Sequence, residues 1–165
     1  MPIIKRTFIR IEGGFVLAYT NALSAYRETR IRTASQGQLI IMLYDEAIKN
    51  LNQGIELLEM NAKGKKDPGR IEKVNKSILK TQEIVTELMV SLDFDQGGEI
   101  AQNLFSLYTW FNQELLEGNI KQDLNHLIGV RDMIIDLRSA WSEIIARYTP
   151  DTPPGKTVGG VNIAG

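Results

Sequence analysis

Residues 25–47, AYRETRIRTASQGQLIIMLYDEA, decide the fold of this chain. A polar leader runs into a helical pattern, and Ser35 and Gln38 have the spacing of a capping box, in which each side chain satisfies a backbone N–H of the other residue. Apolar or aromatic residues then fill every position from 39 to 44. Consecutive residues of a helix point all the way round its axis, whereas a bundle helix needs only one apolar stripe. Another part of the chain or another protein must therefore cover a second side of this helix.

The apolar pattern predicts two helices between residues 36 and 92. The first covers about residues 36–61, with an apolar stripe of Ile40, Leu43, Ala47, Leu51, Ile55 and Leu58. After a turn that contains glycine and proline, Asp67 is placed to cap a second helix that begins at Pro68. The stripe of this second helix is Ile71, Val74, Ile78, Val85, Leu88 and Leu92, with Thr81 in one slot.

Two further patterns follow an interruption at residues 93–98. The third helix has the stripe Ile100, Leu104, Leu107, Tyr108, Phe111 and Leu115. Gly118 fits its C-terminal cap, and Asn119 with Gln122 forms a second capping box that opens the fourth helix. The fourth stripe is Leu124, Leu127, Ile134, Trp141, Ile145 and Tyr148. Because such short loops force antiparallel neighbours, we expect an all-α, antiparallel up-and-down four-helix bundle.

The two ends of the chain are expected to lie outside this bundle. We expect an N-terminal extension over residues 1–24, a bundle domain over 25–148 and a tail over 149–165. The N-terminal segment is apolar and aromatic, so we expect it to pack on the bundle. The tail is rich in proline, glycine and threonine and has little to bury, so we expect disorder. Our hypothesis for residues 1–16 is an error in the gene start or an added segment, because Leu17 reads like a natural beginning.

The composition argues against several classes of function. The 165 residues include no cysteine, which removes disulfides and thiol nucleophiles. A formal net charge of -1 gives no reason to expect nucleic acid or an acidic membrane as a partner. No apolar run approaches the ~18 residues that suggest a membrane span. We therefore expect a cytoplasmic protein without membrane insertion.

The chain offers few groups for catalysis or metal binding. Asp123 and His126, the single histidine, are three residues apart on a helix, as metal ligands can be. A dimetal bundle needs such a pair on two helices and further glutamates. With no nucleophile–base set either, we expect no enzyme, no metal and no cofactor. Arg131 and Arg138 lie on the apolar line of the fourth helix, so we expect them either to be paired or to snorkel at the edge of the stripe. In either case we expect them to set the register and specificity of the bundle.

The excess of apolar residues is the remaining signal. Leu39 and Met42 point off the main stripe of the first helix, and Phe105 and Leu116 do the same on the third. Three interpretations stay open at this point. One is a wide core shared with two neighbouring helices. Another is a structural bundle that dimerises through Leu39 and Met42 or acts as an adaptor. The third is a groove for an amphipathic or extended client.

The motifs and their order resemble the flagellin export chaperones of the FliS family. The resemblance covers about residues 19–148. Its residues are 25–29, 33–37 and 39–47, then 91–94 with 97–104, and finally Arg138, Trp141 and Ile145.

This resemblance implies a function. It implies a helical bundle that binds the C-terminal segment of newly made flagellin in the cytoplasm, prevents its premature polymerisation and keeps it competent for export. The loaded complex would then pass to the flagellar export gate, and self-association into a homodimer stays open. In the free form, the chaperone's own N-terminal segment would occupy part of the client surface. The predicted partner-binding residues are Tyr26 and Ile31 in that movable segment, Leu39, Met42, Leu43 and Tyr44 on the first helix, and Phe105 on the third.

Overall fold

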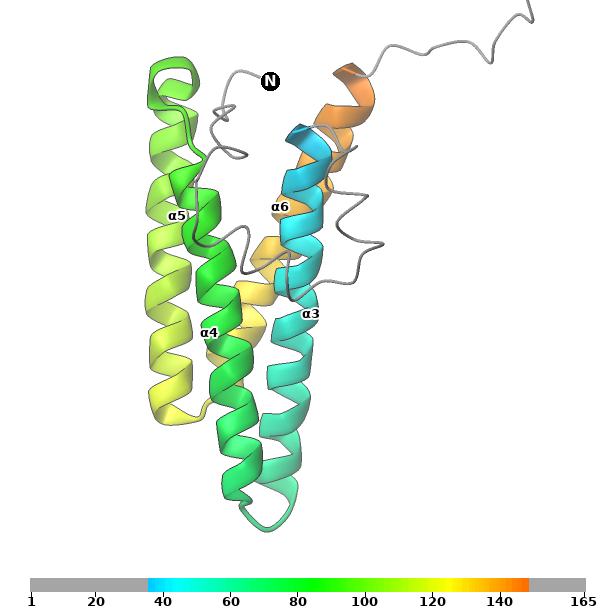
Figure 1. Cartoon of the computed structure of the whole chain (residues 1–165), viewed down its shortest axis with the longest axis vertical. Coiled ribbons are helices and arrows are strands. Elements are labelled where there is room, and N and C mark those ends of the chain that lie inside the picture. The colour runs from blue at the N-terminus through cyan, green and yellow to red at the C-terminus, as the bar shows by residue number, and fades with distance from the viewer. Residues whose placement is uncertain (1–35, 149–165) are drawn as a thin grey trace, which may run out of the picture.

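The computed structural model describes residues 36–148, which form a bundle of four helices (Figure 1). The helices are α3 (Gln36–Lys63), α4 (Pro68–Val90), α5 (Phe94–Lys121) and α6 (Leu124–Tyr148). Short turns join them, so consecutive helices run antiparallel, and α3 and α5 each pack against both α4 and α6. The expected all-α, up-and-down four-helix bundle is confirmed. The N-terminal segment, the expected cap at Ser35 and the C-terminal tail lie outside the described residues.

The predicted stripes form the core. Most of their residues belong to one continuous buried cluster, to which all four helices contribute, and Leu107 and Leu124 pack against it while partly buried. Ile145 near the end of α6 is half-buried outside the cluster. Thr81 is fully buried in its apolar slot, and its hydroxyl donates to the Ser77 carbonyl at 3.0 Å. Ile71 and Ile100 are exceptions, with exposed fractions of 38% and 57%. Both lie close to a turn at an end of the bundle, where a helix has fewer neighbours.

A polar contact crosses the centre of this apolar core. The hydroxyl groups of Tyr44 on α3 and Tyr108 on α5 form a buried hydrogen bond of 2.5 Å. Burial raises the pKa of Tyr44 to about 12, although interactions with Tyr108 and Trp141 lower it in part. Burial also raises the pKa of Tyr108 well above its ordinary value. Because α3 and α5 are diagonal in the bundle, this bond links two helices that do not otherwise pack side by side.

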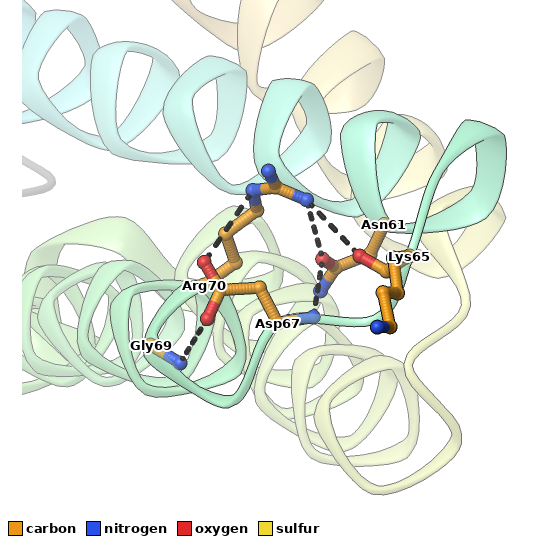
Figure 2. Close-up of polar contacts among 5 residues, drawn as sticks. All are labelled: Asn61, Lys65, Asp67, Gly69 and Arg70. Carbon is orange, nitrogen blue, oxygen red and sulfur yellow. Dashed lines mark hydrogen bonds and ion pairs between the residues drawn. The ribbon is translucent and has the colours of Figure 1, made fainter.

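The turn between α3 and α4 is capped as the sequence predicts. The carboxylate of Asp67 accepts from the Gly69 N–H at 2.9 Å, and a proline occupies the first turn of α4. Arg70 closes the turn, since its guanidinium donates to the side chain of Asn61 and to the Lys65 carbonyl, each at 3.4 Å (Figure 2). The end of α3 and the start of α4 are therefore tied together by side chains on both sides of the turn.

The predicted boundary between the third and fourth helices is wrong. α5 continues past Gly118, and its C-terminal cap is Gln122, which has the left-handed angles φ 52 and ψ 40. Asn119 therefore lies inside α5 instead of opening α6. Asp123 precedes α6, and its carboxylate accepts from the Asn125 N–H at 2.9 Å. A glutamine can adopt a left-handed backbone at a modest energy cost. A sequence-based search for a helix end that looks for glycine therefore misses this cap.

Gly118 serves a close contact between helices instead of a cap. It is buried, and a Cβ atom at this position would lie 2.6 Å from Cδ1 of Leu127 and 2.9 Å from Cβ of His126. The same leucine approaches α3, because a Cβ on Gly54 would lie 3.2 Å from its Cδ2. Leu127 thus lies in a notch between glycines of the two diagonal helices.

We expect Gly118→Ala to destabilise the bundle by ~1–3 kcal/mol, because the added methyl group overpacks the contact with α6. Gly129→Ala is the matched control, since a Cβ at Gly129 meets nothing within 4 Å. In the helix interior, this control should gain ~1 kcal/mol from helix propensity. Urea unfolding of both variants measures the difference. Equal stabilisation by the two substitutions would contradict the close contact at Gly118.

We expect the tyrosine pair to make stability fall at high pH. Unfolded Tyr44 ionises near pH 10.0, whereas the folded side chain resists ionisation up to about pH 12. The stabilisation is therefore fully present below pH 10 and is lost as the pH rises to 12, by roughly 3 kcal/mol. Unfolding of wild type and Tyr44→Phe should be measured between pH 8 and 12. Parallel stability profiles for the two proteins would rule out this linkage.

Candidate functional site

The residues predicted to bind a partner divide between core and surface. Leu43 and Tyr44 are only 7% and 0% exposed and belong to the core cluster. Leu39 is also buried, at 6%, but lies outside that cluster. Met42 is half-buried on α3, and Phe105 is 42% exposed on α5. Among the described residues of the predicted set, only these last two offer an accessible surface.

The other two predicted residues, Tyr26 and Ile31, lie outside the described residues.

Accessible apolar side chains gather on α4 and α5 instead of α3. The exposed large apolar residues are Ile71, Leu79 and Val90 on α4, and Phe94, Ile100, Phe105, Trp110, Leu116 and Ile120 on α5. Met60 on α3 and Met133 and Ile135 on α6 are exposed as well. Leu116 was predicted to point away from its stripe, and its 51% exposure confirms this. The face between the two helices holds side-chain amides, since Gln82 donates to the Asn112 carbonyl at 3.1 Å. A surface that combines apolar groups with amide groups suits an amphipathic or extended segment.

Phe94 is a surface residue that sequence reasoning missed, because residues 93–98 looked like a plain interruption. Asp93 caps the start of α5, and its carboxylate accepts from the N–H groups of Asp95 and Gln96 at 3.1 and 3.2 Å. The sequence does contain a signal for this cap, because Asp93 directly precedes Phe94 and aspartate is a preferred N-cap residue. The capped turn presents the Phe94 ring with an exposed fraction of 44%.

A kink at Gly98 brings this ring to the body of α5. The ring centroids of Phe94 and Phe105 are 5.8 Å apart, in an edge-to-face arrangement. In a straight helix, eleven residues would separate the two positions by ~16 Å along the axis. Gly98 has the angles φ 49 and ψ -126, which only glycine adopts easily, and these fold the first turn of α5 back. The aromatic pair therefore depends on the backbone of one glycine.

The arginines of α6 are paired, which is one of the two arrangements predicted. Arg138 forms a two-pronged contact with Asp45 on α3, in which Nη2 lies 3.2 Å from Oδ2. Arg131 pairs with Asp132 at 2.9 Å and donates to Asn52 on α3 at 3.3 Å. These partly exposed contacts align α6 with α3, and each contributes at most ~1 kcal/mol.

The histidine takes part in a contact between helices. His126 Nδ1 on α6 lies 2.7 Å from Glu114 Oε2 on α5, and it is not paired with Asp123 in a ligand set. In the helices and turns from residue 36 to 148, no three His, Cys, Asp or Glu side chains are grouped to hold a metal ion. Over the same residues, none of the helices combines the length and apolar character required to cross a membrane.

Comparison with known proteins gives the family. A family model described as "Flagellar protein FliS" matches residues 19–148. The chain is 27% identical over 135 residues to the "Flagellar secretion chaperone FliS" of Bacillus subtilis, covering 82% of this chain and 94% of that protein. It is 30% identical over 116 residues to the protein of the same name in Escherichia coli K12, covering 70% of this chain and 80% of the relative.

A solved structure shares the fold. It is described as "Crystal structure of flagellar chaperone from bacteria" and superposes with a TM-score of 0.60 at 17% identity, over 80% of this chain and 98% of the other. The match of the family model, the identity to several relatives and the shared fold agree with one another. The chain therefore belongs to the FliS family of flagellar proteins.

Proposed function

We propose that this protein is a cytoplasmic flagellar secretion chaperone that binds the C-terminal segment of flagellin. In this role it prevents premature polymerisation of the subunit and keeps it competent for export. The names of the relatives from Bacillus subtilis and Escherichia coli, each a flagellar secretion chaperone, support the proposal. The structural observation that carries it is the set of apolar side chains left exposed along α4 and α5.

Most of the exposed large apolar side chains of the described helices lie on one helical hairpin. Leu79, Val90, Phe105 and Leu116 are each at least 42% exposed, and all lie on the two helices that form one hairpin. Contiguous apolar surface on a soluble protein marks a place where another chain binds. An unfolded flagellin segment would gain ordered structure by covering these side chains, and it would be kept from other subunits while it did so.

The predicted site residues have different roles in this proposal. Met42 and Phe105 contact the client directly, since they remain accessible on α3 and α5. Leu39, Leu43 and Tyr44 support that surface from below. Tyr26 and Ile31 belong to the movable N-terminal segment, and by number they fall at the start of the domain of residues 25–148, after the extension over residues 1–24. This segment covers part of the surface in the free protein and leaves when the client arrives.

The rest of the proposal concerns the fate of the complex. The loaded chaperone passes its client to the flagellar export gate. The protein works as a binding module without catalysis or cofactor. A second candidate is a structural bundle that dimerises through the same exposed apolar side chains, since a second copy would also cover them.

We expect titration calorimetry with the C-terminal segment of the same organism's flagellin to give one-to-one binding and a large negative heat-capacity change. Met42→Glu and Phe105→Glu should each weaken binding by about tenfold or more, because each places a charge in a desolvated contact. Met60→Glu is the matched control, because Met60 is 46% exposed near the far end of α3. Leu39→Glu is unsuitable, because Leu39 is only 6% exposed and the charge would be buried.

Circular dichroism should show unchanged helicity in all three variants. Absence of heat and of any shift in melting temperature, also after removal of residues 1–24, would contradict flagellin binding. Sedimentation that shows a stable dimer, whose formation the flagellin segment does not oppose, would favour the structural bundle.

A further inference from the structure

We propose that the corner between α4 and α5 docks a cationic amphipathic segment of a protein partner. This corner consists of Val90 at the end of α4 and of Phe94, Asp95, Glu99 and Phe105 on α5. It lies at the end of the bundle where α3 begins and α6 ends (Figure 1). The inference goes beyond the proposed function, since it specifies the charge of the bound segment and does not rest on flagellin supplying it.

The apolar part of the corner is preformed. Phe94 and Phe105 hold each other edge to face at 5.8 Å, and each remains more than two-fifths exposed. The cap by Asp93 and the kink at Gly98 fix the position of Phe94 before any partner arrives. Aromatic rings of this kind offer apolar area to a partner helix and a negative face to a lysine or an arginine.

The stretch of chain that forms this corner carries negatively charged side chains and no positively charged ones. Between Lys80 and Lys121 the chain contains no lysine and no arginine. The acidic residues in that interval are Glu83, Glu87, Asp93, Asp95, Glu99, Glu114 and Glu117. Asp95 and Glu99 are exposed at the corner, and within the described helices neither forms an ion pair with a cation.

A buried carboxyl group without a partner supports the same conclusion. Glu87 is only 6% exposed, and its Oε1 atom has no hydrogen-bond partner among the described residues. Helical spacing places Glu87 on one face of α4 with Glu83 and Val90, four residues before it and three residues after it. Burial raises the pKa of its carboxyl group. A buried acceptor of this kind costs free energy until a donor reaches it, and an ammonium or guanidinium group would supply one.

The exposed aromatic rings and the carboxylates of the corner together favour one kind of bound segment over the others. A second copy of this chain presenting the same corner would bring carboxylates against carboxylates, which is unfavourable. An anionic membrane or a nucleic acid would be repelled for the same reason. A segment with apolar residues on one side and lysine or arginine on the other satisfies both the rings and the carboxylates.

The test uses the full chain and two synthetic helical peptides with an identical apolar face. The polar face is built from lysine and arginine in one peptide and from glutamate in the other. Fluorescence anisotropy at physiological salt should show that the cationic peptide binds about tenfold more tightly or better, and that the preference shrinks as salt is raised. Equal affinity for the two peptides would overturn the proposal.

Variants locate the binding. Asp95→Asn combined with Glu99→Gln should weaken binding of the cationic peptide about tenfold, since two charge contacts are lost with little change in shape. Glu56→Gln combined with Glu72→Gln is the matched control, because these exposed acids lie on α3 and α4 towards the opposite end of the bundle. Binding by the Asp95/Glu99 variant with the affinity of wild type would place the peptide elsewhere and overturn the proposal.

Two further variants test the aromatic pair. Phe94→Ala should weaken the cationic peptide about fivefold through loss of the ring. Gly98→Ala should have a similar effect without removing any contact group, since the positive φ of 49 strains alanine and shifts Phe94 from Phe105. Circular dichroism confirms that both variants keep their helices. Unchanged affinity in both would show that the rings are not part of a docking site, contrary to the proposal.

Discussion

The hydrogen bond between Tyr44 and Tyr108 is the contact on which the rest of the bundle depends. The surrounding core is almost entirely apolar, and apolar contacts are not directional, so helices that share only such contacts can shift against one another. Two buried hydroxyl groups that must meet at 2.5 Å allow one arrangement of α3 relative to α5. The arginine contacts from α6 to Asp45 and Asn52 then align the outer side of α3 in agreement with that arrangement.

Much of this architecture could be predicted from the sequence, since periodic apolar positions report directly on which side of a helix is buried. The four stripes, the turn at Asp67 and the paired arginines were all predictable on that basis. The boundary before α6 was not, because glycine at position 118 has two possible uses and only packing distinguishes them. Its missing side chain makes room for Leu127, and the left-handed position falls four residues later, on Gln122.

The candidate site was less predictable than the fold. The continuous apolar run over residues 39–44 looked like an excess for one helix, yet only Ile41 and Met42 are half-buried and the other four side chains are buried. α3 lies between α4 and α6 and buries two sides at once, which accounts for most of the run without a partner. Most of the exposed large apolar groups are on α4 and α5, and Phe94 reaches this surface only through a backbone bend. The net charge of -1 did not reveal the acidic corner either. It is a sum over the whole chain, and it hides the long interval between Lys80 and Lys121 that contains no lysine or arginine.

The notch that holds Leu127 between Gly54 and Gly118 makes the bundle mechanically asymmetric. The Leu127 side chain occupies the space that a Cβ atom would need at either glycine, and close-packed contacts of this kind yield little. The notch lies near the turn that joins α5 to α6, so about twenty residues of α6, or ~30 Å of helix, extend from it to the other end. A small rotation at the notch is multiplied along that lever. Motion of α6 relative to α3 and α5 is therefore expected to be smallest beside the notch and largest where α6 ends.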